Sequence, residues 1–171
     1  MEINHQKYMA AALKLAARAA REGEVPVGAV VVRRGEIVGR GWNRRENGKC
    51  ATAHAEFRAI ENACKRLGGW RLWECDLYVT LEHCPMCAGA IVNSRIRRVV
   101  FGARDPKAGA VGSVFNLFEY PLNHRPEVVE GVMEKECSDL LREFFARLRE
   151  KRSKKNAAVA ADPADDTVGK V

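Results

Sequence analysis

The sequence lacks the marks of membrane, secreted and repeat proteins. No stretch of its 171 residues approaches the roughly 18 consecutive apolar residues of a membrane helix. The opening segment, MEINHQKYMAAALKLAARAAREGE, has acidic and polar side chains early and apolar ones at helical spacing, unlike a signal peptide. We find no internal repeat. These absences predict a cytoplasmic protein with no membrane partner.

Disulfides are also unexpected, although the chain has six cysteines, because thiols stay reduced in the cytoplasm. Cys64 and Cys137 fall among apolar helical positions, where buried structural thiols are expected. Cys84 and Cys87 stand apart, with the spacing Cys-x-x-Cys. That spacing leaves open a redox dithiol, a disulfide, half of a zinc site or two buried thiols.

Alternating helical and strand patterns predict one α/β domain. The 171 residues, 47% of them hydrophobic, are enough for one domain with a proper core. Helices are predicted over 5–21, 51–67, 84–94 and about 133–152, and strands over 25–32, 36–43, 76–81, 97–103 and 127–132. The expected fold is a three-layer α/β/α domain with a mixed central sheet of about five strands. It covers residues 1–152, and a tail over 153–171, first basic and then of low complexity, is expected to be disordered.

The positive charge of the chain is partly local. The net charge is +7, and the segment RLREKRSKK (147–155) holds six basic residues and one acidic residue. Such a segment suggests an anionic partner, with nucleic acid first. The alternative is a solvated helix end that only keeps the protein soluble, and charge alone does not separate the two.

A possible metal site combines two helix starts. His54 opens one predicted helix, and Cys84 and Cys87 open another, with Pro85 at its first helical position. A helix N-terminus lowers the pKa of a thiol, and the thiolate is the form that binds metal. One imidazole and two thiolates make three ligands of tetrahedral zinc, which leaves a fourth position open for catalysis. A thioredoxin-like redox pair has no need of the upstream His-Ala-Glu, so zinc is the preferred interpretation.

Glu56 is better suited to proton transfer than to metal binding. Residues two apart on a helix point to different sides, so Glu56 is a poor fourth ligand beside His54. Zinc lowers the pKa of bound water from 15.7 to about 7. Glu56 could take the proton from that water and pass it to the substrate nitrogen and then to the leaving group.

These residues carry a resemblance to a known family. His-Ala-Glu followed by Cys-x-x-Cys resembles the zinc-dependent nucleobase deaminases. The segments VPVGAVVV, GWN, TAHAE, CPMCAGAIVNSRI and VVFGARDPKAGA stand in the order found in bacterial tRNA adenosine deaminases. The resemblance spans about residues 5–150. It implies the cytidine-deaminase-like fold, one zinc ion per subunit, a homodimer, and conversion of adenosine to inosine at wobble position 34 of an arginine tRNA anticodon loop.

The resemblance also implies roles for single residues. His54, Cys84 and Cys87 match the zinc ligands of the family, and Glu56 matches its proton shuttle. Residues expected to meet the substrate are Asn43 and Ala55 at the flipped nucleoside, Asp105 with its loop against the RNA, and Phe144, Phe145 and Arg147 at the anticodon loop. Core packing is the alternative for Phe144 and Phe145, and it is expected for one of them.

One position departs from the family pattern. His83 stands where most members have proline before the first cysteine. Proline there fixes φ and removes a hydrogen-bond donor, whereas histidine adds a possible ligand. We expect His83 to be a bystander, because a fourth protein ligand would close the open position of the metal.

Two other functions compete with tRNA deamination. The first is a deaminase of the same fold that acts on free guanine or cytosine, and the basic last helix and the GARDPKAGA segment speak against it. The second is a non-catalytic zinc module that binds RNA or pairs with an active subunit. His83 is the only support for that function, and Glu56 speaks against it.

Overall fold

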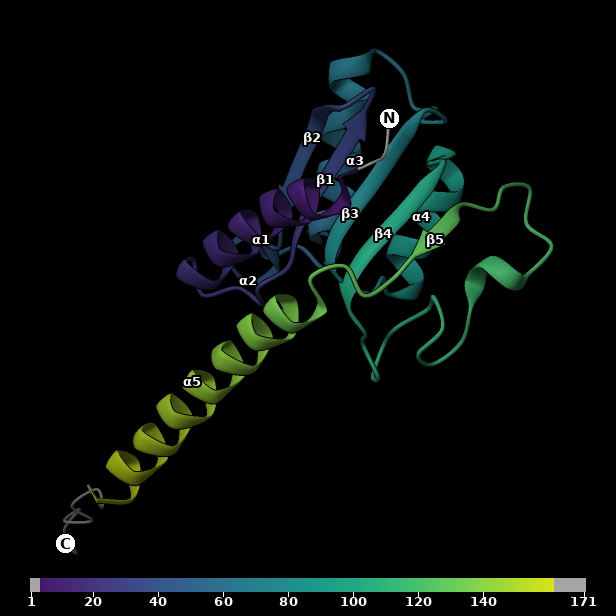
Figure 1. Cartoon of the computed structure of the whole chain (residues 1–171). Coiled ribbons are helices and arrows are strands. Elements are labelled where there is room, and N and C mark those ends of the chain that lie inside the picture. The colour runs from purple at the N-terminus through teal and green to yellow at the C-terminus, as the bar shows by residue number, and fades with distance from the viewer. Residues whose placement is uncertain (1–3, 162–171) are drawn as a thin grey trace, which may run out of the picture.

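The computed structural model describes residues 4–161 and shows a sheet with helices on both faces (Figure 1). The strands are β1 (Gly28–Arg33), β2 (Glu36–Trp42), β3 (Cys75–Leu81), β4 (Arg98–Ala103) and β5 (Glu127–Val129). The helices are α1 (His5–Arg21), α2 (Arg45–Gly48), α3 (Ala55–Leu67), α4 (Pro85–Ser94) and α5 (Glu134–Ala161), with a short 3₁₀ turn at Leu117–Glu119. No helix among the described residues has the length and apolar character needed to span a membrane.

The five strands form one mixed sheet in the order β2-β1-β3-β4-β5. Strand β1 is antiparallel to both β2 and β3, whereas β3, β4 and β5 run parallel. The predicted five-stranded mixed sheet is confirmed. Its topology brings the carboxyl ends of β3 and β4 to the same edge, which is where ligand sites of open α/β sheets lie.

Alternating side chains of the strands enter two separate hydrophobic cores. Leu77 and Val79 point toward α3 and α4, and Tyr78 between them points toward α1 and α5. In β4, Val99 enters the core on the side of α3 and α4, and Val100 enters the core on the side of α1 and α5. Strands buried on both faces read as continuous apolar runs, and this explains the sequence of the central strands. The sheet is therefore the middle layer of the predicted three-layer domain (Figure 1).

Two glycines of β2 let α3 lie very close to the sheet. A Cβ atom at Gly39 would overlap the carbonyl oxygen of Ala59, and one at Gly41 would overlap that of Ala55. Only glycine allows so close an approach of two backbones. Since Ala55 is the first residue of α3, these contacts set the position of the helix start that carries His54.

A short helix, α2, follows β2 in a segment for which the sequence predicted neither helix nor strand. Its backbone N–H groups at Glu46 and Asn47 donate to the carboxylate of Glu24, at 3.1 and 2.8 Å. The acceptor lies more than twenty residues upstream, so the local pattern does not reveal this cap.

The last helix is longer than predicted. It continues to Ala161, so the expected disordered tail is helical from residue 153 to that point, while 162–171 lie outside the described residues. The segment 134–161 contains neither glycine nor proline and ends in alanine-rich sequence, which favours helix without tertiary contacts. Cys137 and Leu141 pack against the sheet, whereas 147–157 are exposed and the helix projects from the domain (Figure 1).

Candidate active site

The two predicted metal-binding segments both begin a helix. His54 is the N-cap residue of α3, and Cys84 is the N-cap residue of α4, followed by Pro85 at the first helical position. Both caps have extended backbone, and neither side chain bonds to the amides of its own helix. The imidazole and the thiol are therefore available for another partner. The predicted place of Cys84 at the cap is confirmed.

The ligand atoms lie at distances suited to one metal ion. The Nδ1 atom of His54 is 3.7 Å from Sγ of Cys84 and 3.6 Å from Sγ of Cys87, and all three atoms lie within 4.8 Å of one another. Tetrahedral zinc with Zn–S near 2.3 Å and Zn–N near 2.0 Å separates sulfur from nitrogen by about 3.5 Å. The three side chains thus fit zinc, and with three ligands they leave a fourth position.

Electrostatics at the site favour a thiolate before any metal binds. Hydrogen bonds from Cys87 and from His54 lower the pKa of the Cys84 thiol to about 4, against the effect of burial. The same interaction with Cys84, together with burial, raises the pKa of Cys87. The pair is therefore one thiolate that shares a proton with one thiol. A divalent cation would displace that proton, because it stabilises both sulfurs in the thiolate form.

Glu56 lies in the first turn of α3, almost completely buried beside these ligands. Burial opposes its ionisation, but the hydrogen bond from His83 helps to outweigh that effect, and the pKa of Glu56 is lowered. Glu56 does not join His54, Cys84 and Cys87 in the metal-binding group of the described residues. A buried carboxylate held ionised next to a metal site can accept a proton.

His83 borders the metal-binding group without joining it, as expected, but it makes a contact that was not predicted. Its ring is completely buried, and its Nδ1 lies 3.3 Å from Oε1 of Glu56. It lies outside the metal-binding group of the described chain, so it does not close the open position. The imidazole of His83 is long enough to reach Glu56 in the first turn of α3, which a proline ring at this position could not do.

The neighbouring Glu82 is a residue that sequence reasoning missed. Its buried carboxylate accepts hydrogen bonds from the backbone N–H groups of Asp105, Val111 and Ser113, at 3.0, 3.1 and 3.0 Å, and from the hydroxyl of Ser113. A Cβ atom at Gly109 would collide with this carboxylate. One side chain therefore holds together the loop over residues 104–113. The partners are far along the chain, and no local signal shows them.

Replacing Glu82 by alanine is expected to lower the free energy of unfolding by roughly 3 kcal/mol, because one buried and two part-buried amides lose a charged acceptor. Hydrogen exchange at Asp105, Val111 and Ser113 should accelerate more than elsewhere. Denaturant titration measures the first effect and mass spectrometry the second. The control is Glu119→Ala, at an exposed acid close to the same loop, with an expected loss below about 0.5 kcal/mol. Equal stability of the two variants would contradict this role.

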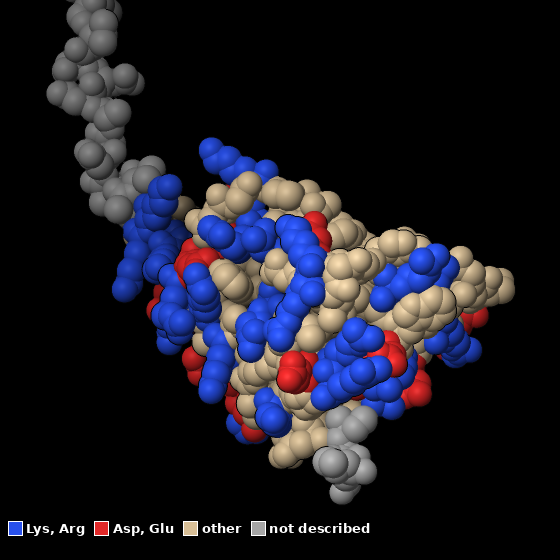
Figure 2. All heavy atoms as spheres, turned by 90° about the horizontal axis from the view of Figure 1, so that it is seen from above, with Lys and Arg blue, Asp and Glu red and all other residues tan. Residues whose placement is uncertain are grey.

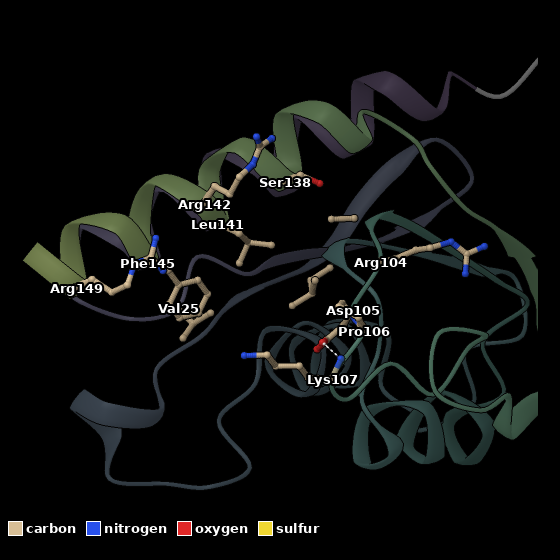
Figure 3. A pocket seen from close by; sticks show the side chains of 12 residues that line it. Val25, Arg104, Asp105, Pro106, Lys107, Ser138, Leu141, Arg142, Phe145 and Arg149 are labelled. Atoms are coloured by element: carbon tan, nitrogen blue, oxygen red, sulfur yellow. Dashed lines mark hydrogen bonds between the residues drawn. The ribbon is translucent and has the colours of Figure 1, made fainter.

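A groove opens at the same edge of the sheet (Figure 3). Its volume is about 590 Å³, and Leu81 and Ala103, the last residues of β3 and β4, form its floor. The loop 104–107 lines one side and α5 the other, with Phe145 and Arg149 from the helix turned toward the opening (Figure 3). The groove shares the carboxyl edge of β3 with the start of α4, but its lining includes none of His54, Cys84 and Cys87.

The residues predicted to meet substrate are brought only partly together. Asp105 and Phe145 line the groove, and 40% of the Phe145 side chain is exposed, as suits a contact residue. Phe144 is half-buried and packs edge-to-face on Phe145, with ring centroids 5.5 Å apart. Arg147 is exposed outside the lining and pairs with Glu143 at 3.8 Å. Arg142 and Arg149 also line the groove; Arg149 belongs to the basic segment 147–155 noted in the sequence, whereas Arg142 was not predicted.

Asn43 and Ala55 lie beside the metal ligands. Both are buried, and the backbone N–H of Ala55 donates to Oδ1 of Asn43 at 3.0 Å. The N–H of Ala55 therefore already has a partner, and the side-chain amide nitrogen of Asn43 is the group left for a ligand. Their contacts with a nucleoside remain a prediction.

Positive charge is not confined to α5. Seen from above, lysine and arginine side chains are spread over the far end of the domain and gather again where α5 ends (Figure 2). Arg33 and Arg34, which bind Glu74, stand at the turn between β1 and β2, and β1 pairs there with the start of β3. That end is opposite to the candidate site. Charge alone therefore does not locate a nucleic-acid surface.

The fold and the site together define a class of protein. Two helix starts in an α/β/α domain bring one histidine and two cysteines beside a buried glutamate, as in the zinc-dependent nucleobase deaminases. The model of the cytidine and deoxycytidylate deaminase zinc-binding region matches residues 2–103.

Individual relatives define the family more closely. A tRNA-specific adenosine deaminase of Bacillus subtilis (strain 168) is 55% identical over 146 residues, which cover 85% of this chain and 91% of that protein. A structure from studies of A-to-I editing by tRNA:A34 deaminases at the wobble position of transfer RNA superposes with a TM-score of 0.77 at 46% identity, covering 79% of this chain and 99% of the other. A guanine deaminase of Nitrosomonas europaea superposes with a TM-score of 0.72 at 28% identity, covering 85% and 86%. The chain belongs to this zinc-binding deaminase family, and within it to the tRNA-specific adenosine deaminases.

Proposed function

We propose that the protein hydrolyses the wobble adenosine, position 34, of an arginine tRNA to inosine. The observation that carries this proposal is the position of Glu56 next to the His54, Cys84 and Cys87 group, at the edge where the groove of α5 opens. The similarity to tRNA-specific adenosine deaminases supports the substrate. The cytoplasm, where tRNA is modified and thiols stay reduced, is the proposed location.

The roles of the residues follow from their geometry. His54, Cys84 and Cys87 would hold zinc, which supplies a Lewis acid that activates water at neutral pH. Glu56 accepts one proton of the attacking water and gives it to the ring nitrogen of adenine; it then takes the second proton from the hydroxyl formed at C6 and delivers it to the amine, which leaves as ammonia while the carbonyl of inosine forms. Because Glu56 is ionised and buried, it starts in the form that takes a proton, with little competing solvent.

The groove suits an RNA loop more than a free base. Attack at C6 of adenine requires the base to leave its stack, and loop nucleotides are already partly unstacked, so the cost is a few kcal/mol at most. Phe145 offers a face on which a flanking base can stack, while Arg142 and Arg149 can meet phosphates. Asn43 and Ala55 would face the flipped nucleoside, and Asp105 and Arg147 the loop around it.

Inosine formation on a transcribed arginine tRNA tests the proposal directly. Zinc-loaded protein should convert position 34 and leave free adenosine, guanine and cytosine unchanged. Conversion of guanine or cytosine alone would make the protein a free-base deaminase, like the guanine deaminase that superposes on it. If no substrate is converted, the remaining hypothesis is a non-catalytic zinc module that binds RNA or pairs with an active subunit.

Removing charge from α5 should weaken tRNA binding and flatten its salt dependence. The variant Arg147→Gln/Arg149→Gln/Arg152→Gln removes three charges from the exposed part of the helix. If all three residues contact phosphates, the negative slope of log K against log[salt] should become shallower by roughly 2 to 3. Filter binding at several salt concentrations measures both the affinity and the slope.

A matched control separates a local effect from the loss of net charge. Arg34→Gln/Arg66→Gln/Arg71→Gln removes the same charge from exposed positions outside the groove lining. This variant should retain affinity and slope close to those of the wild type. If the two triple variants have the same tRNA affinity and the same salt dependence, the end of α5 is a solvated helix and does not bind tRNA.

We also propose a homodimer. Helix α4 is apolar on nearly all sides, which is typical of a helix covered on both faces. Its outer residues Met86 and Ala90 line a hollow of about 510 Å³ with Phe57 and Trp70, and Trp70 is half exposed. A second copy of the chain seated there would bury this surface. Sedimentation of a monomer at micromolar concentration would refute the dimer.

A further inference from the structure

His83 is a buried histidine to which the proposed mechanism assigns no role. It lies between β3 and α4, next to Cys84, with no exposed surface. Its backbone is fixed, because its carbonyl oxygen accepts the N–H of Ala110 at 2.8 Å. Its side chain therefore has a defined direction, across to the first turn of α3.

The two ring nitrogens of His83 have different surroundings. Nδ1 is 3.3 Å from Oε1 of Glu56, whereas Nε2 is buried and has no hydrogen-bond partner within residues 4–161. The ring lies edge-on to Phe101, with centroids 6.1 Å apart. A carboxylate accepts only, so Nδ1 carries the hydrogen. Leaving a bare nitrogen in apolar surroundings costs less than leaving an N–H there, which favours the Nδ1–H tautomer.

This contact affects the freedom of Glu56. A glutamate has three rotatable side-chain bonds, and holding it still costs conformational entropy. His83 makes a side-chain hydrogen bond to Glu56, and it occupies Oε1. The second oxygen, Oε2, stays available for proton transfer. A general base that is already held in the reactive orientation reacts faster than one that must first adopt that orientation.

We propose that His83 is a positioning residue, whose Nδ1–H holds the Glu56 carboxylate in the orientation that serves proton transfer. The inference rests on the proposed deamination, because it assigns a role within that reaction. In the family that the sequence resembles, proline at this place has no N–H or other donor to offer. This chain thus supports its proton shuttle with a hydrogen bond that a proline at this position could not make.

Two substitutions separate the hydrogen bond from the shape of the ring. In His83→Asn the side-chain amide can take the place of Nδ1–H, whereas His83→Leu fills the space without a donor. His83→Leu should lower kcat on tRNA by about 10- to 100-fold, the usual range for residues that orient a catalytic group, with KM unchanged. His83→Asn should recover most of that loss. Phe101→Leu, which disturbs the other side of the ring, should leave kcat near the wild-type value.

Two measurements do not depend on turnover. The zinc content of His83→Leu should equal that of the wild type, and ¹⁵N NMR of the histidine ring should show hydrogen on Nδ1 and a bare Nε2. Loss of zinc would make His83 a ligand, and hydrogen on Nε2 would exclude the bond to Glu56. Failure of His83→Asn to recover kcat, or an effect on KM alone, would also overturn the proposal.

The wild-type assay keeps this test apart from that of the function. If the wild type converts only a free base, the proposed function fails, and the same variants are compared on that base. If it converts tRNA and all His83 variants equal it, the positioning role fails alone.

Discussion

Glu56→Gln is expected to lower kcat for inosine formation about a thousandfold, within the range of general acid–base catalysis. Glutamine has the shape of glutamate but neither accepts nor returns the proton at neutral pH. KM should change little, because the groove and the basic helix bind the tRNA. Single-turnover conversion of labelled tRNA measures the rate of the chemical step, and the zinc content shows that the metal site is intact.

A control on the same helix is Glu61→Gln, at an exposed position of α3. It changes the same chemical group and should leave kcat at the wild-type value. Inosine formation by Glu56→Gln at the wild-type rate would refute the role of Glu56, whatever the substrate. A loss of zinc from Glu56→Gln would instead show that this carboxylate supports the metal ligands.

The parts of the structure that depend on local chemistry are those that sequence could predict. Proline after Cys84 fits the first helical position and nowhere deeper in the helix, so the start of α4 could be placed to the residue. Apolar runs showed the central strands in the same way. Once both helix starts are known, the metal group of His54, Cys84 and Cys87 follows from its residue types.

Contacts between distant segments could not be predicted from local patterns. The hydrogen bond of Glu56 with His83 joins positions 27 residues apart, and the bonds of Glu82 reach across the loop 104–113. The first depends on how close α3 lies to the sheet, which the glycines of β2 allow, and the second depends on the pairing of β3 with β4. The sequence showed that His83 is unusual, but only the packed structure shows what it touches.

The length of α5 illustrates a different limit. The lack of apolar periodicity in the final stretch suggested disorder, yet alanine and lysine are strong helix formers that need no core. The helix is consequently presented to solvent with its basic side chains exposed. This exposure makes the charge of 147–155 available to an anionic partner. The two triple arginine variants test whether tRNA binds to this charge.

Removing one zinc ligand should have the largest effect on the reaction. In Cys84→Ala the bound zinc should fall from about one ion per chain to a small fraction, because a thiolate at a helix N-terminus is lost from a site of three ligands. Water with an ordinary pKa of 15.7, instead of about 7, then supplies very little nucleophile at neutral pH. Inosine should become undetectable, and atomic absorption together with the tRNA assay measures both losses.

Cys50→Ser is the matched control, since Cys50 is exposed and lies outside the metal-binding group. It should keep both zinc and activity. Treating the wild type with a chelator should reproduce the loss seen in Cys84→Ala, and added zinc should restore activity only to the wild type. Because zinc would link the starts of α3 and α4, its removal should also lower the unfolding temperature. Full activity of Cys84→Ala without zinc would contradict metal-dependent deamination, and it would leave Glu56 as the only group able to activate water.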